Sequence, residues 1–249
     1  MLAELAPEEL ADALDAVAAE VLAAAGVEGP PVDAFAVARA LGITVAEDDR
    51  QRGRARFVRL KRRGRSAPRA TILLRPDPRP ERRHWAVAHE IGEHAAYRLF
   101  ELLSVDPREA DPAARERTAN QLAGRLLLPA AWFGEDGPAL DWDLPELKTR
   151  YATASHELIA RRMLDFPPPV AITIYDHGRV TLRRSNVTGR VPAPSAREIE
   201  CWRRAHETGL PQQTTEATGT VRAWPVHEDG WKREIVRTEG EEWSDGVME

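Results

Sequence analysis

The residues best suited to chemistry lie in one short stretch, "AHEIGEHAAY", at positions 88–97. It nearly reproduces the zinc-binding pattern His-Glu-x-x-His: His89 and Glu90 fit, but the fourth residue after His89 is Glu93, and the histidine follows at His94. In that pattern two ligands one helical turn apart bind the ion, and the glutamate takes a proton from water. The stretch therefore predicts a metal site and leaves its second ligand open.

Helical geometry favours Glu93 over His94 as that ligand. An α-helix turns about 100° per residue, so positions i and i+4 are about 40° apart and positions i and i+5 about 140° apart. His89 and Glu93 therefore share a face, while His94 pairs with Glu90 on the neighbouring face and could orient that base. His94 would reach the His89 face only through a one-residue π-type bulge, which Gly92 would tolerate. The alternative reading is a charged, solvated helix face with no metal.

The elements around this stretch indicate a small sheet packed on helices. Apolar residues at helical spacing predict a long helix over residues 80–103, which places the stretch in mid-helix. Two antiparallel strands, 54–62 and 70–77, precede it, and an edge strand is expected at 43–48. Amphipathic helices are predicted earlier, at 7–26 and 33–42.

A second helix is predicted within residues 108–129, "READPAARERTANQLAGRLLLP", ending before Pro129. Glu116 and Asn120 lie one turn apart on it. A catalytic zinc site commonly has three protein ligands, and a carboxylate from a distant segment is a frequent third one. Farther on, "LKTRYATASHELIARRML" predicts two short helices joined by a turn.

Composition limits the possible partners and compartments. The formal net charge of −5 argues against a nucleic-acid-binding surface, and the one cysteine, Cys201, indicates a reducing compartment. No run approaches the length of a membrane span, and the N-terminus carries acidic residues instead of the basic ones of a signal peptide. We therefore expect a cytoplasmic protein without membrane association or direct nucleic-acid binding.

The C-terminal third reads mainly as β-structure. A hairpin is predicted over 167–186, a short helix over 195–209, and two strands around an Asp-Gly turn over 219–238. Trp224 and Trp231 flank that turn and are expected to pair across it. Cys201 is expected to be a packed small side chain, and the last residues form a predicted flexible tail.

Taken together, "HWAVAHEIGEH" and the later "ERTANQLAGRLLLP" resemble the ImmA/IrrE family of metallopeptidases, over about Val32 to Asn186. The resemblance implies an α+β fold: a zincin-like body with a small antiparallel sheet on helices, followed by a small C-terminal β appendage. The corresponding domains are an N-terminal helix (1–30), the metallopeptidase domain (31–188), and a C-terminal extension with a β-hairpin and flexible tail (189–249).

Carried onto this chain, the resemblance implies His89 and Glu116 as metal ligands and Glu90 as the general base. Glu93 stands where the family has its second histidine, with His94 as the alternative ligand. A carboxylate there would neutralise more of the ion's charge, leave the bound water less acidic, and so make proteolysis slow or very selective.

The function implied by the resemblance is a metal-dependent endopeptidase that hydrolyses a protein substrate through a metal-activated water. The metal is expected to be Zn²⁺, with Mn²⁺ as the alternative, and a transcriptional repressor is the candidate substrate. The displaced histidine supports a second hypothesis, a metal-stabilised protein-interaction module that has lost hydrolysis.

Overall fold

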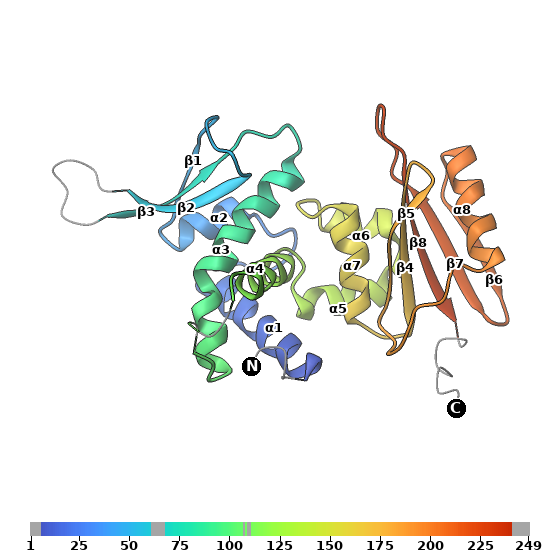
Figure 1. Cartoon of the computed structure of the whole chain (residues 1–249), viewed down its shortest axis with the longest axis horizontal. Coiled ribbons are helices and arrows are strands. Elements are labelled where there is room, and N and C mark those ends of the chain that lie inside the picture. The colour runs from blue at the N-terminus through green and yellow to red at the C-terminus, as the bar shows by residue number, and fades with distance from the viewer. Residues whose placement is uncertain (1–5, 61–67, 107, 109–110, 241–249) are drawn as a thin grey trace. The chain divides into compact units, whose positions relative to one another are not determined.

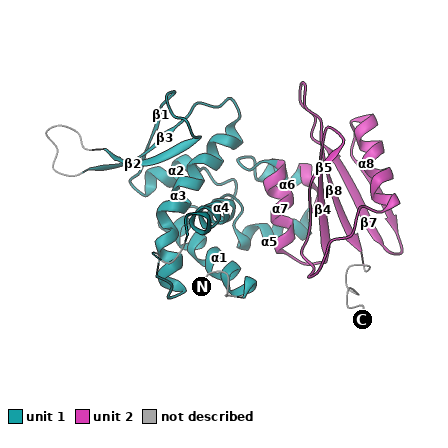
Figure 2. Cartoon of the chain, viewed as in Figure 1, with its two compact units in different colours: residues 1–140, 146–155 teal, residues 141–145, 156–249 magenta. Residues whose placement is uncertain are grey.

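The computed structural model describes residues 6–60, 68–106, 108 and 111–240, and the chain forms two compact units (Figures 1 and 2). Unit 1 comprises residues 1–140 and 146–155, and unit 2 comprises residues 141–145 and 156–249. Each contains helices and one sheet, so the predicted α+β class is confirmed. The predicted flexible tail lies mostly at 241–249, outside the described residues.

Unit 1 is helical apart from a three-stranded sheet. Its elements are α1 (Pro7–Ala24), α2 (Ala34–Ala40), β1 (Thr44–Glu47), β2 (Ala55–Leu60), β3 (Arg69–Leu74), α3 (Pro80–Leu102), α4 (Pro112–Leu127) and α5 (Ala130–Ala139), and the short α6 (Leu144–Arg150) begins in unit 2 and ends in unit 1.

The sheet of unit 1 has the strand order β1-β3-β2. The predicted antiparallel pairing of β2 with β3 and the predicted edge position of β1 are confirmed. The sheet is nevertheless mixed, because β1 pairs with β3 in parallel. Strand β2 lies between them in the chain but on the far side of β3 in the sheet, where it pairs antiparallel with β3.

Helix α3 is the centre of unit 1, in contact with β2, β3 and the helices α1, α2 and α4. It begins with Pro80 in its first turn, where a missing N–H costs nothing, and its buried stripe includes Ile91, Ala95 and Leu99. Helix α4 starts at the Asp111 cap, whose carboxylate accepts a hydrogen bond from Ala114 N–H at 2.6 Å. Its end before Pro129 confirms the sequence prediction.

Gly92 is the point of closest approach between α3 and α4. A Cβ there would lie 2.8 Å from the Ala119 carbonyl oxygen and 3.1 Å from Leu122 Cβ. The glycine that the sequence suggested as tolerant of a helix bulge thus serves a different purpose, because it lets the two helices that carry the candidate ligands approach each other.

Gly92→Ala is therefore expected to lower the free energy of unfolding by about 1–3 kcal/mol, because backbone of α4 must move to admit one methyl group. Chemical denaturation measures this change. Gly29→Ala is the matched control, since a Cβ at Gly29 meets nothing within 4 Å. Equal stability of the two variants would contradict the close-packing interpretation.

Unit 2 is built on a five-stranded sheet in the order β5-β4-β8-β7-β6. Its elements are α7 (His156–Arg162), the 3-10 turn η2 (Met163–Asp165), β4 (Val170–Asp176), β5 (Arg179–Ser185), α8 (Ala196–Thr208), β6 (Gln212–Glu216), β7 (Gly219–Pro225) and β8 (Arg233–Gly240). Figure 1 shows α8 along one face of this sheet, where Cys201 is buried as predicted.

The hairpin β4–β5 and the strands of the C-terminal extension belong to one sheet, because β4 pairs with β8 along its whole length. Strand β4 is buried at almost every position and therefore needs a partner on both edges. The predicted domain boundary between residues 188 and 189 falls inside this unit.

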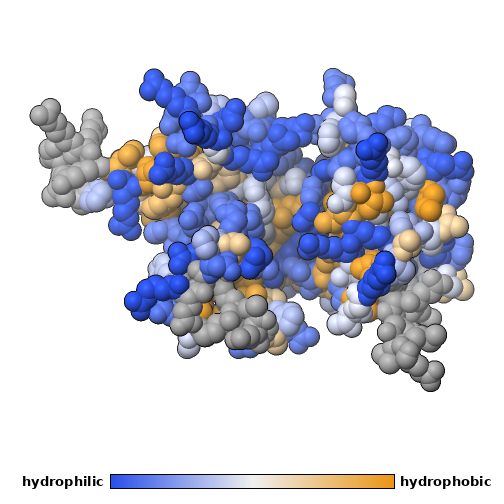
Figure 3. Space-filling model, in the orientation of Figure 1, coloured by the Kyte–Doolittle hydropathy of each residue, from blue (hydrophilic) through white to orange (hydrophobic). Residues whose placement is uncertain are grey.

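Figure 3 shows hydrophilic residues over most of the visible face, with apolar residues in small groups between them. Among the described helices, none is both long and apolar enough to cross a membrane.

Candidate functional site

The candidate metal centre lies in unit 1, where α3 faces α4. The Nε2 atom of His89 is 3.6 Å from Oε2 of Glu116, so the structure brings together two residues that the sequence separates by a loop. Ligand atoms of His89, Glu90 and Glu93 lie within 4.8 Å of one another. The structure thus places His89 next to Glu116 of α4 and, on its own helix, next to Glu90 and Glu93.

Asn120 holds the His89 ring in a fixed orientation. The Nδ1 atom of His89 is 3.2 Å from Oδ1 of Asn120, and the Asn120 amide donates in turn to Oε1 of Glu116 at 3.0 Å. With the proton on Nδ1 donated to Asn120, Nε2 keeps its lone pair and points toward Glu116. Metal-binding histidines usually donate their other ring N–H to an oxygen in this way.

Glu90 is held at the sheet edge by β2. Its side chain is buried, 6% exposed, and its Oε2 accepts a hydrogen bond from Phe57 N–H at 2.6 Å. Burial raises the pKa of the Glu90 carboxyl above its usual range, the Phe57 hydrogen bond opposes this effect, and the nearby Glu93 charge adds to it. A carboxylate with a raised pKa is a better proton acceptor, which suits a general base.

His94 faces the strand. Its ring stacks on Phe57 with the centroids 4.9 Å apart. Desolvation lowers the pKa of His94, and the charges of Arg59 and Arg98 lower it further, which favours the neutral ring. Helix α3 is a regular α-helix from 80 to 102 without a π-type turn, and His94 therefore stays off the His89 face.

The site opens into a cavity of about 230 Å³ lined by residues of α3, α4 and the start of β2. Trp85, one turn before His89, and Arg54, just before β2, line it together with His89, Glu90, Glu116 and Asn120. Helical spacing placed Asn120 one turn from Glu116 but indicated no role for it, and the sequence indicated none for Trp85 or Arg54. Asn120 and Trp85 each lie four residues from a predicted ligand, which was the available signal. Arg54 reaches the cavity only through the β2–α3 packing, for which the sequence offered no signal.

The donor set fits a divalent ion. One imidazole nitrogen and the carboxylates of Glu93 and Glu116 are available, and Zn²⁺ accepts both ligand types. A set with more oxygen than nitrogen also suits Mn²⁺. Glu93 and Glu116 are exposed, so both carboxylates can adjust to an ion without breaking buried contacts.

The comparisons with known proteins identify the family of this chain. The sequence profile of the M78 peptidases, the IrrE N-terminal-like domain, matches residues 38–163, just over half of the chain. This chain belongs to the IrrE N-terminal-like (M78) family. The family is metal-dependent, and the M78 match covers His89, Glu90, Glu93 and Glu116.

Among solved structures, a Mycobacterium tuberculosis transcriptional regulator is similar in fold to this M78 protein. The TM-score is 0.63 at 17% sequence identity, over 97% of this chain and 84% of that one. No curated protein matches the sequence significantly.

Proposed function

We propose that this M78 protein is a metal-dependent endopeptidase that cleaves a protein substrate inside the cytoplasm. The observation that carries the proposal is the His89–Glu116 contact with Asn120 behind it, because a histidine fixed by its second nitrogen and aimed at a carboxylate from another helix is the arrangement of a metal-ligand pair. Glu90 next to this pair supplies a base.

His89, Glu93 and Glu116 would hold the ion, Zn²⁺ or Mn²⁺. When bound, the ion supplies Lewis-acid chemistry, polarising a peptide carbonyl and making water a better nucleophile. Glu90 accepts a proton at its carboxylate and can pass it to the leaving amine. Phe57 N–H holds the carboxylate in place, and the cavity beside Trp85 and Arg54 is where a peptide would lie.

The candidate substrate is a transcriptional repressor, and the similar fold of a transcriptional regulator supports a role in gene regulation.

A specific observation also supports a second function. His94 lies on Phe57, and Glu93 takes the position of the second histidine, which would weaken hydrolysis. The alternative is therefore a metal-stabilised regulatory module that binds its partner without cutting it.

Chelation separates these two functions. Protein loaded with Zn²⁺ or Mn²⁺ and added to a cell extract is expected to generate new peptide N-termini, to stop doing so after metal removal, and to resume when the ion returns. Mass-spectrometric profiling of N-termini measures this. Extracts with unchanged N-termini, from which the loaded protein nevertheless captures a partner, would contradict the peptidase and favour the module.

The choice between Glu93 and His94 is tested by paired alanine variants. Glu93→Ala is expected to weaken metal affinity at least about tenfold because it removes a ligand, whereas His94→Ala should change it less than about threefold. Competition with a chromophoric chelator measures both affinities. The reverse order would identify His94 as the ligand and require a local rearrangement of α3.

A further inference from the structure

A second cluster of ligand-type side chains lies in unit 2, in the C-terminal sheet. Ligand atoms of His206, His227 and Glu234 lie within 4.8 Å of one another. They come from three elements: His206 from the last turn of α8, His227 from just after β7, and Glu234 from β8. We propose that these three residues bind a Zn²⁺ ion, independently of the site in unit 1.

The carboxylate at the centre of this cluster lacks the partner that a buried anion normally has. Glu234 is 0% exposed, yet among the described residues its ion-pair partners are the two imidazoles, with no arginine or lysine. Both rings converge on the same oxygen, Oε1, with His206 Nδ1 at 2.9 Å and His227 Nε2 at 2.6 Å. Buried charges are usually paired or coordinate metals, and an ion among these three atoms would neutralise the carboxylate.

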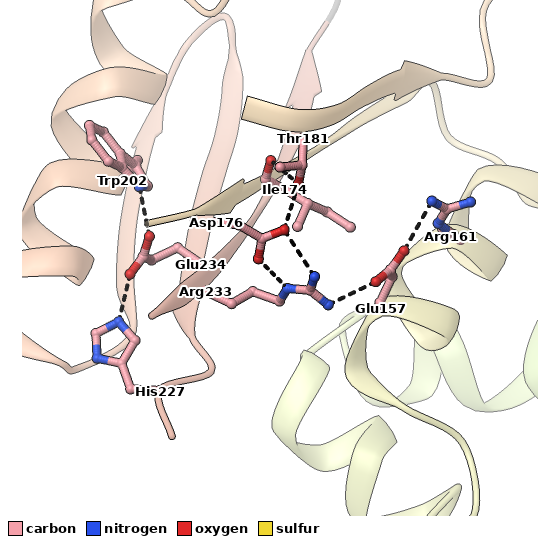
Figure 4. Close-up of polar contacts among 9 residues, drawn as sticks. All are labelled: Glu157, Arg161, Ile174, Asp176, Thr181, Trp202, His227, Arg233 and Glu234. Carbon is pink, nitrogen blue, oxygen red and sulfur yellow. Dashed lines mark hydrogen bonds and ion pairs between the residues drawn. The ribbon is translucent and has the colours of Figure 1, made fainter. Parts of the chain in front are cut away.

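The positive charge nearest to Glu234 in the sequence, that of Arg233, points away from Glu234. Arg233 precedes Glu234 on β8, and because side chains alternate along a strand it projects from the opposite face (Figure 4). There it contacts Asp176 at 2.7 Å and Glu157 at 2.7 Å. Arg233 thus pairs with carboxylates on the opposite face and does not neutralise Glu234.

The second carboxylate oxygen is held by an indole. Trp202 Nε1–H donates to Oε2 of Glu234 at 3.0 Å, as Figure 4 shows, and the Trp202 ring is itself stacked on Tyr175 with centroids 4.5 Å apart. Glu234 therefore presents only Oε1 to the histidines. An outer hydrogen bond that orients a carboxylate toward one ligand position is a regular feature of metal sites.

The backbone fixes the histidines in the same region. Trp202 and His206 are one turn apart on α8, and Val226 N–H donates to the Arg233 carbonyl at 2.7 Å, which extends the β7–β8 ladder to the residue before His227. His206 is also in the C-terminal turn of α8, where the helix dipole favours a cation. The histidine side chains are 29% and 25% exposed, so solvent reaches the cluster.

The spacing suits zinc. Ligand atoms about 2.0–2.1 Å from a tetrahedral ion are about 3.4 Å apart, so the two observed contacts need to open by less than about 1 Å. Two imidazoles and one carboxylate are a known zinc ligand set, and water from the exposed side would be the fourth ligand. Bound zinc would tie the end of α8 to the β7–β8 turn.

The test uses variants that keep the hydrogen bonds and remove the ligands. His206→Asn and His227→Gln can place an amide N–H where Nδ1 and Nε2 now stand, but neither amide replaces imidazole as a zinc ligand. The full chain with Glu116→Ala, which disables the unit 1 site, is expected to hold one Zn²⁺ per chain. Adding His206→Asn and His227→Gln should remove it, as measured by atomic emission after dialysis against micromolar zinc.

His177→Gln is the matched control, because His177 is an exposed histidine of the same unit that contacts Trp231, 4.5 Å between centroids. It should retain the ion. A second measurement leaves His206 and His227 unchanged: X-ray absorption of the zinc-loaded Glu116→Ala protein should show two imidazole ligands, whereas the unit 1 site, with His94 off the His89 face, offers only His89. A zinc-free Glu116→Ala protein, or zinc unaffected by the double substitution, would overturn the proposal. A zinc-free Glu116→Ala protein leaves the peptidase hypothesis untouched, whereas zinc that persists after all three substitutions would also remove Glu116 from the ligand set of the unit 1 site.

Discussion

Glu90→Gln is expected to lower the rate of peptide cleavage by about 10²- to 10⁴-fold while leaving metal content and stability unchanged. A glutamine oxygen can still accept the Phe57 hydrogen bond that holds Glu90 now, so the side chain should keep its place. It cannot accept a proton. The measurement is the rate at which metal-loaded variant and parent generate a cleaved product in the same extract.

Glu101→Gln is the control for this experiment, since Glu101 is an exposed glutamate of the same helix. Equal cleavage by Glu90→Gln and the parent would reject Glu90 as the base. A variant that loses cleavage but keeps its full effect in cells would instead show that the protein acts as a binding module.

Glu116→Ala is expected to remove the metal ion of unit 1. Without it, His89 and Glu93 from a single helix leave the ion largely hydrated and weakly held. Metal analysis should show one ion fewer per chain than in the parent. In the His206→Asn/His227→Gln background, where the proposed second site is absent, no ion should remain.

Asn120→Ala and Glu135→Ala show whether the effect of Glu116→Ala is that of losing a ligand. Asn120 orients His89 without binding the ion, so its loss should weaken affinity about 10- to 100-fold and still allow full occupancy at high metal concentration. Glu135 is an exposed glutamate of unit 1 away from the cavity lining, and its replacement should have no effect. One ion per chain in Glu116→Ala combined with His206→Asn and His227→Gln, measured at low metal concentration, would remove Glu116 from the ligand set.

Local patterns determined much of the candidate site. The apolar stripe of α3 and the prolines that bound α4 predicted both helices, and helical periodicity alone placed Glu93 on the His89 face. The family resemblance paired Glu116 with His89, and the structure brings the two side chains together. Their roles as ligands stay a prediction until metal binding is measured.

These local patterns could not predict contacts between segments that are distant in the sequence. The stacking of His94 on Phe57 and the hydrogen bond from Phe57 to Glu90 depend on how β2 packs on α3, which no periodicity encodes. The expected pairing of Trp224 with Trp231 was wrong, because the β7–β8 register sets Trp224 opposite Ile235. Trp231 lies instead beside His177.

By itself, the sequence determined which helices form and which residues share a face of each one, because these properties depend on neighbours within one or two turns. Only the tertiary structure decided that β4 pairs with β8, and that His206, His227 and Glu234 meet around one carboxylate oxygen. Strand register and the packing of α8 on the sheet set these contacts, because they bring together side chains that are many residues apart in the sequence.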